Sequence, residues 1–116
     1  MTFADNMTLK EVQNKNEFLE WVAGQIGGKY YENSFWEPFP YVYFGDNNSF
    51  LKLVFVPNVK QFRYDFCINE KLESYDREIG DESKIGALIG FMNNRIQVIK
   101  DTLVEKKEEE IAEDFK

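Results

Sequence analysis

The feature that most constrains the fold is a strict alternation of side chains in the run Gln61–Ile68. Every even-numbered residue from Phe62 to Ile68 is aromatic or aliphatic, whereas the residues between them are arginine, aspartate and cysteine. A period of two is that of a β-strand with one buried face and one wet face. This run therefore predicts a half-buried strand.

Two further β-like runs precede it, Tyr41–Gly45 and Phe50–Val56, and residues 46–49 and 57–60 separate the three. Both separators are rich in turn-forming residues, which predicts a β-meander with the second run in the centre. Residues 29–32 could add an edge strand. The prolines that follow, Pro38 and Pro40, exclude residues 37–40 from a central strand.

Two amphipathic helices flank these runs. Asn14 and Glu17 have the spacing of a capping box, and an apolar stripe then continues to Gly27-Gly28, where a left-handed residue can end a helix. We expect a first helix over residues 15–26, with an extra turn from Thr8 as an open alternative.

The last part of the chain predicts a long helix, because apolar residues recur there at steps of three and four. We expect this stripe to cover the strand face that carries Phe62, Tyr64 and Phe66. Its members are Ile85, Leu88, Ile89, Met92, Ile96, Ile99 and Leu103.

A second apolar surface is expected on the opposite side of that helix, where Phe91 and Val98 lie near Gly86 and Gly90. Two glycines in a helix interior each cost about 1 kcal/mol relative to alanine, so close packing of another backbone is the expected reason. Either the first helix crosses there, or Phe91 and Val98 form a homodimer contact.

The predicted fold class is therefore α+β: an N-terminal helix, a three-stranded or four-stranded antiparallel β-meander, and a long C-terminal helix packed on one sheet face. We expect residues 1–7 to be a loose end, residues 8–104 a single domain, and residues 105–116 a charged helical extension or tail.

The composition excludes most catalytic chemistry. The chain has no histidine, so neither a histidine-activated nucleophile nor an imidazole metal site is available. Its one cysteine, Cys67, has no partner for a disulfide, and no glycine-rich phosphate loop is present. We expect no enzyme activity, no catalytic residue, no metal and no cofactor.

The charge is acidic, with a net value of −7. This argues against direct nucleic-acid binding, which needs clustered basic residues. No apolar run reaches the roughly 18 residues of a membrane span, and the chain start lacks the pattern of a secretory signal, so we expect a soluble cytoplasmic protein without membrane contact.

The acidic residues are concentrated in residues 65–82, where seven carboxylates stand against two basic residues, a net charge of −5. Such a segment is usually a solvated loop, but carboxylates at fixed spacing also suit a basic surface on a partner. The candidate partner-binding carboxylates are Glu73, Asp76, Glu78, Asp81 and Glu82.

Two aromatic residues in the stretch before the meander, Trp36 and Phe39, have no obvious place in the predicted elements. One interpretation is that they fold over an open end of the core. The other is that they form an exposed anchor for a partner, since aromatic side chains supply large contact areas.

We therefore expect a non-enzymatic binding protein that engages a basic site on a nucleic-acid-handling protein. In size, charge and fold class the chain is similar to small phage-encoded inhibitors of bacterial defence systems, several of which mimic DNA. That resemblance implies an inhibitor that occupies a nucleic-acid-binding site. The alternatives are a structural subunit that assembles into homo-oligomers and a carrier of a small ligand.

Overall fold

The computed structural model describes the backbone of residues 3–75 and 84–114, and the side chains of residues 3–72 and 84–107. The elements, in chain order, are η1 (Leu9–Glu11), α1 (Lys15–Ile26), β1 (Lys29–Tyr31), β2 (Tyr41–Gly45), β3 (Phe50–Val56), β4 (Gln61–Ile68), β5 (Lys71–Tyr75) and α2 (Ile85–Asp114).

The sheet has five antiparallel strands in the order β1-β2-β3-β4-β5. The prediction of three or four strands was wrong because it assigned β5 to a polar connection. Asn69 and Glu70, with φ of 50° and 69°, make the tight turn that brings β5 back beside β4. Two-residue hairpin turns of this kind match the twist of the flanking strands. The turn therefore allows residues 71–75 to pair with β4 as an edge strand, although their sequence has no apolar alternation.

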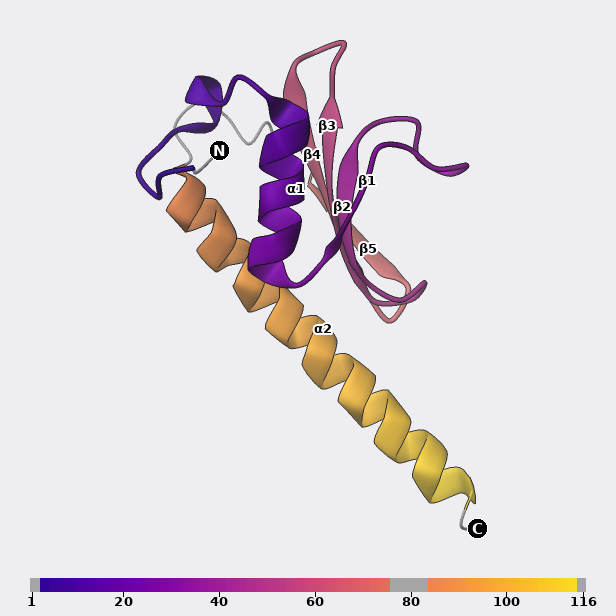
Figure 1. The fold of residues 1–116 in the computed structure, drawn as a ribbon. Coiled ribbons are helices and arrows are strands. Elements are labelled where there is room, and N and C mark those ends of the chain that lie inside the picture. Colours follow the sequence, from indigo (N-terminus) through magenta and orange to yellow (C-terminus); the bar gives the residue numbers. More distant parts are fainter. Residues whose placement is uncertain (1–2, 76–83, 115–116) are drawn as a thin grey trace.

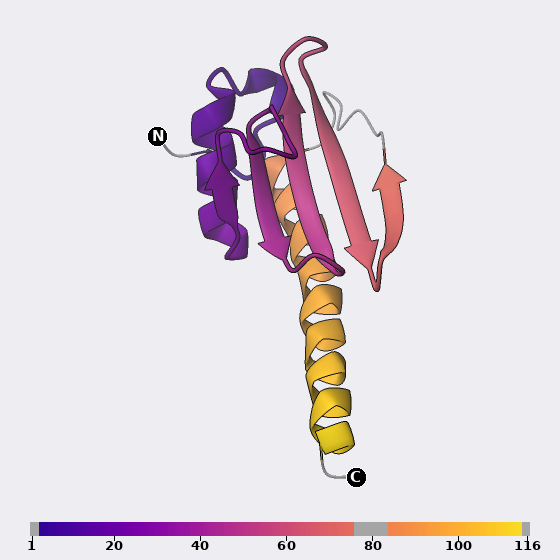
Figure 2. The same cartoon turned by 90° about the vertical axis from the view of Figure 1, so that its right-hand side faces the viewer.

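The molecule has two layers, as Figures 1 and 2 show: both helices lie on one face of the sheet, and no helix covers the other, which we call the open face. α1 packs on β1 and β2, and α2 packs on β2, β3 and β4. The predicted α+β class is confirmed. The sheet therefore presents one broad surface that no helix covers.

The core lies between the sheet and the helices. The even-numbered residues of β4 face α2, as the alternation predicted, and the apolar stripe of α2 meets them. One buried cluster contains Phe62, Tyr64, Phe66, Leu88, Met92 and Ile96.

The ends of α1 follow from its sequence. The side chain of Asn14 accepts a hydrogen bond from the Glu17 backbone N–H at 3.1 Å, which satisfies one of the free donors of the first turn. At the other end, Gly27 takes the left-handed conformation with φ of 73°. Thr8 begins the separate short helix η1, where its N–H donates to the Glu11 carboxylate at 2.9 Å.

The N-terminal segment is packed on the body, contrary to the loose end expected for residues 1–7. Phe3 is buried, and its ring lies 5.4 Å from the rings of both Phe18 and Trp21. The sequence around Phe3 shows no periodicity, so a single aromatic anchor of this kind was not recognised. Residues 3–7 belong to the domain.

This segment also accepts hydrogen bonds from free backbone N–H groups at the start of α2. The backbone N–H groups of Ile85 and Gly86 donate to the carbonyls of Met7 and Asp5, at 2.9 and 2.8 Å. A Cβ on Gly86 would lie 3.1 Å from the Asp5 carbonyl oxygen, so the backbone that approaches this glycine is the N-terminal segment. The expectation that α1 crosses there was wrong, and Gly90 faces open space.

The C-terminal half of α2 runs beyond the sheet as a projecting rod (Figures 1 and 2). Among its side chains up to residue 107, the last to pack against the core is the partly buried Leu103, and Val104 is already exposed. Among the described residues, no helix combines the length and the apolar character that crossing a membrane requires.

Candidate functional site

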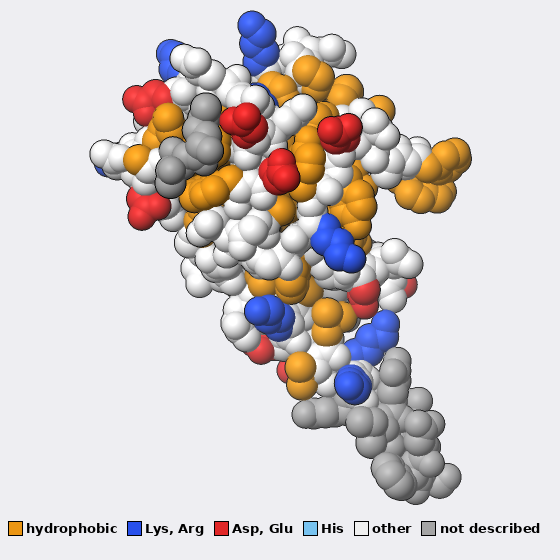
Figure 3. Space-filling view, in the orientation of Figure 1, with side chains coloured by type: hydrophobic (Ala, Val, Ile, Leu, Met, Phe, Trp, Pro, Cys, Tyr) orange, Lys and Arg blue, Asp and Glu red, His pale blue; other side chains and the backbone are white. Residues whose placement is uncertain are grey.

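The most exposed aromatic side chains of the described chain stand next to each other in the loop that joins β1 to β2. Phe35 is 90% exposed and Trp36 is 85% exposed. Their ring centroids are 4.9 Å apart in an edge-to-face arrangement. In Figure 3 an apolar knob projects from this loop, away from the body. We call Phe35 and Trp36 the aromatic tip.

The loop is closed directly behind the aromatic tip. The Ser34 backbone N–H donates to the Glu37 carbonyl at 2.7 Å, and the Glu37 N–H donates to the Ser34 hydroxyl oxygen at 3.2 Å. Serine favours such local bonds to the backbone two or three residues along the chain. Only Phe35 and Trp36 lie between the two bonded residues, so the tip has a short, closed base.

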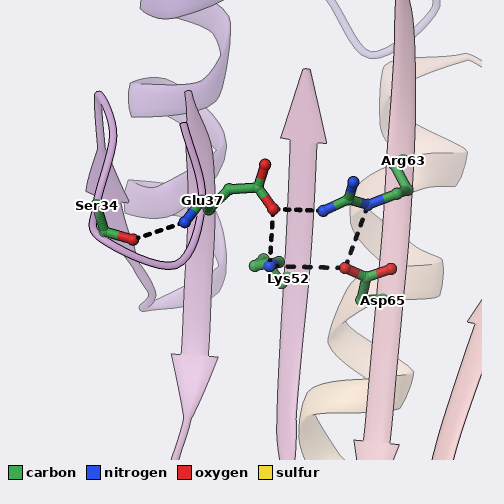
Figure 4. A network of polar contacts seen from close by, with 5 residues as sticks. All are labelled: Ser34, Glu37, Lys52, Arg63 and Asp65. Carbon is green, nitrogen blue, oxygen red and sulfur yellow. Dashed lines mark hydrogen bonds and ion pairs between the residues drawn. The ribbon is translucent and has the colours of Figure 1, made fainter. Parts of the chain in front are cut away.

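The side chain of Glu37 fastens this base to the open face of the sheet (Figure 4). One oxygen of its carboxylate accepts hydrogen bonds from Lys52 on β3, at 3.1 Å, and from Arg63 on β4. Asp65 completes the group, with its oxygen 3.7 Å from the Lys52 Nζ and 3.3 Å from the Arg63 Nε. We call Glu37, Lys52, Arg63 and Asp65 the charge network.

The carboxylates of the charge network are largely shielded from water, and the four side chains balance in charge. The side chain of Glu37 is only 7% exposed and that of Asp65 is 13% exposed. Burial lowers the pKa of Arg63, but the carboxylates of Asp65 and Glu37 outweigh it and the net shift is upward. Ion pairs are stronger in such partly dry surroundings than on an open surface. The loop is therefore held to the sheet by charged bonds from two strands.

The open face is also lined with stacked aromatic rings beside the network. Tyr31 stacks on Tyr41 at 5.1 Å, and Tyr43 stacks on Phe50 at 5.4 Å. The ammonium of Lys52 lies 5.6 Å from the centre of the Tyr41 ring. These contacts hold Lys52 between a ring and two carboxylates, which fixes the cation that binds Glu37.

The structure places the two predicted aromatic residues differently, and partner binding by either one stays a prediction. Trp36 is exposed and does not fold over the core, whereas Phe39 is half-buried and takes no part in the tip. The second exposed ring belongs to Phe35, which was missed. The signal that could have found it is the spacing of Ser34 and Glu37, which closes a loop around the two residues between them.

No described contact joins the predicted partner-binding carboxylates to the loop that carries the aromatic tip. The backbone of Glu73 lies in β5, where it pairs with Phe66. Asp76, Glu78, Asp81 and Glu82 lie outside the described residues. Their segment is joined to Tyr75, the last residue of β5.

Phe91 and Val98 on α2 are partly exposed, at 42% and 43%. The ring of Phe91 nevertheless rests on Tyr64, with centroids 5.4 Å apart, and the Arg95 guanidinium lies 5.2 Å from its centre. Val98 also lines a hollow beside β4 and the β4–β5 turn.

Cys67 lies on the open face of β4 but is buried, and its thiol donates to the Asn48 carbonyl at 3.2 Å. Burial raises the pKa of the thiol, which keeps it protonated and weakly nucleophilic. Within residues 3–72 and 84–107, no three side chains of cysteine, aspartate or glutamate gather in a way that would hold a metal ion.

Comparison of the chain with protein-family models, with curated proteins and with solved structures finds no match.

Proposed function

We propose that this chain is a non-enzymatic binding protein that inserts its aromatic tip into an apolar recess of a protein partner. The observation that carries this proposal is the exposure of Phe35 and Trp36 on a loop that the charge network holds in place. Tryptophan is among the residues that contribute most to protein interfaces. Because the loop is fastened, its backbone loses little further freedom on binding, so more of the contact energy appears as affinity.

The acidic segment supplies the second part of the proposed surface. In an antiparallel meander, the β1–β2 connection and the end of β5 lie at the same end of the sheet. The segment that carries Asp76, Glu78, Asp81 and Glu82 therefore begins at the end where the aromatic tip projects. We place the partner's basic surface opposite it.

The partner that fits both parts is a nucleic-acid-handling protein whose basic groove is flanked by an apolar recess. The net charge of −7 attracts such a surface and speeds the encounter. Exposed ion pairs contribute only about 0–1 kcal/mol each, so the tip provides most of the affinity. By occupying the groove, the protein would act as an inhibitor of the phage type, in the cytoplasm, where the unpaired Cys67 stays reduced.

The first experiment compares capture of partners by the parent chain and by a Phe35→Ala/Trp36→Ala variant, with lysate of the source cells. Because both rings are exposed, the variant should keep its melting temperature, and it should lose the partner that the parent enriches. Val59→Ala is the matched control, since Val59 is an exposed apolar residue in another turn. If the variant and the control capture the same partner equally well, the tip is not the docking element.

The second experiment tests the charge. Asp76, Glu78, Asp81 and Glu82 are changed together to Asn or Gln, and the affinity for the captured partner is measured across a salt series. We expect weaker binding at low salt and a flatter salt dependence than for the parent. Unchanged affinity and unchanged salt dependence would remove the basic groove from the proposal and leave a partner bound by the tip alone.

A further inference from the structure

A groove opens on the side of the molecule where α2 passes β4 and the β4–β5 turn. It is a hollow of about 420 Å³. The residues that line it come from β4, from the turn and β5, and from α2: Phe66, Ile68, Asn69, Lys71, Arg95 and Val98. α2 makes few contacts with β5, so the groove is bounded by the sheet on one side and by the helix on the other.

The groove combines an apolar floor with positive charge. The Arg95 guanidinium lies 5.1 Å from the centre of the Phe66 ring and 5.2 Å from that of Phe91, which places it against aromatic side chains at the groove. Lys71 is exposed on β5 at the opposite wall. Among the described lining residues there are two cations and no carboxylate, in a chain whose net charge is −7.

The chain itself contains a segment of matching chemistry. Residues 108–116 read EEEIAEDFK, with five carboxylates, one lysine and the two large apolar residues Ile111 and Phe115. The backbone of α2 continues as a helix through Asp114. An acidic helix with one or two apolar side chains suits a groove that pairs apolar floor with basic rims.

The helical part of this segment, which ends at Asp114, cannot reach the groove of its own molecule. At 1.5 Å per residue, Glu110 lies about 18 Å along the helix axis from Val98, and α2 is continuous between them. The rod points away from the sheet (Figure 1). A groove that the segment fills must belong to another copy.

We propose that the protein forms a twofold-symmetric homodimer in which the acidic end of each α2 lies in the groove of the other copy. Two α2 helices running antiparallel bring each end beside the other's Arg95, and both contacts form at once because a twofold axis makes them equivalent. The pairing covers Val98, which lines the groove, and Phe91, which lies beside Arg95. It leaves the open face of the sheet, and with it the aromatic tip, free, so a dimer presents two tips.

Sedimentation analysis of charge variants tests this dimer. The parent chain should sediment as a dimer. Arg95→Glu, and separately the triple change of Glu108, Glu109 and Glu110 to Lys, should each raise the dissociation constant by roughly tenfold or more, because like charges then face each other. Placing both sets of changes in one chain should restore the dimer. Lys29→Glu, which makes the same change of charge on the opposite edge strand, should leave the parent's dissociation constant unchanged.

The truncated chain 1–107 provides a second variant that does not touch the groove. It should sediment as a folded monomer, with folding checked by circular dichroism. A parent chain that is monomeric at tens of micromolar, or a dimer that persists in both chain 1–107 and Arg95→Glu, overturns the proposal. Neither result bears on the aromatic tip, whose binding is measured separately.

Discussion

At the scale of single residues, Glu37 is the residue on which the candidate site depends most. It is a carboxylate with 5% of its surface exposed, in a loop whose neighbours Phe35 and Trp36 are almost fully exposed. A buried carboxylate is stable only when it is paired, and Lys52 and Arg63 provide that pairing. The same residue therefore closes the loop through its backbone and fastens it through its side chain.

Glu37→Gln should loosen the loop without changing the aromatic tip. The substitution leaves Lys52 and Arg63 with Asp65 as their remaining carboxylate in the network, and we expect a loss of about 1–3 kcal/mol of stability, measured by urea unfolding. Affinity for the partner should also fall, because the tip is no longer held in place. The control is Glu32→Gln, an exposed carboxylate in the same connection. Equal stability of Glu37→Gln and the parent would show that the network does not hold the loop.

Asp46 makes the turn between β2 and β3 sensitive to pH. Its carboxylate accepts hydrogen bonds from the backbone N–H groups of Ser49 and Asn48, both at 2.8 Å, and these bonds lower its pKa from the ordinary value of 3.8. A carboxyl group whose pKa is lower in the folded than in the unfolded chain stabilises the fold at pH values above its unfolded-state pKa. This stabilisation is lost as the pH falls through the folded-state pKa.

The test compares the parent with Asp46→Asn by thermal unfolding between pH 7 and pH 2. The amide keeps an acceptor oxygen but has no charge to titrate. We expect the parent to be the more stable of the two at neutral pH and its advantage to shrink below about pH 4. An advantage that stays the same over the whole range would mean that the ionised form is not favoured by the turn.

Phe66 tests the assignment of the strand faces. It is 4% exposed, between the sheet and α2. Phe66→Ala should cost about 3–5 kcal/mol in the free energy of unfolding, because the surrounding core does not collapse into the space. Val59→Ala, in an exposed turn, is expected to cost little. A loss below about 1 kcal/mol for Phe66→Ala would contradict the packing of β4 against α2.

At the scale of elements, the two ends of the chain contribute differently to the fold. The N-terminal segment buries Phe3 and accepts the first backbone hydrogen bonds of α2 through Asp5 and Met7. Beyond Leu103, α2 leaves the sheet and Val104 is exposed. Stability should therefore depend on the first end and not on the second.

Two truncations check this difference. Removal of residues 1–7 should lower the stability by several kcal/mol, on the order of the loss of one buried aromatic side chain together with two hydrogen bonds. Removal of residues 106–116 should change the stability of the monomer by less than about 0.5 kcal/mol. The comparison is made by thermal unfolding at a protein concentration low enough to exclude dimers. A larger effect of the second truncation would place the C-terminal end on the body.

The elements that the sequence predicts well are those whose own side chains pack the core. β4 and α2 carry their periodicity because one face of each is buried, so the shared cluster of Phe66 and Met92 could be anticipated. β5 is an edge strand held by a turn and by pairing with β4. Its sequence has no apolar face of its own, so no pattern in the sequence predicts the strand.

The candidate site was predictable only in part, for a related reason. An exposed tryptophan and a buried one look alike in a sequence, so Trp36 could be singled out but not placed. The contact that places it joins Glu37 to Lys52 and Arg63, which lie 15 and 26 residues further along the chain. Charge pairs between distant residues follow from the register of the sheet and leave no local pattern.

At the scale of the whole molecule, the two faces of the sheet have different roles. The helix-covered face supplies stability, and the open face carries the charge network and the loop with the aromatic tip (Figures 2 and 4). A single layer of helices is enough to bury the core of a chain this short. The remaining surface is then available for a partner.

Fluorine NMR of the chain labelled with 5-fluorotryptophan can detect at a single side chain whether Trp36 enters a partner. The chain has two tryptophans, the partly buried Trp21 and the exposed Trp36, so two resonances are expected, and Trp36→Phe assigns them. When the captured partner is added, we predict that the Trp36 resonance shifts and broadens while that of Trp21 keeps its position. A complex that forms with the Trp36 resonance unchanged would contradict the proposal that Trp36 enters the partner.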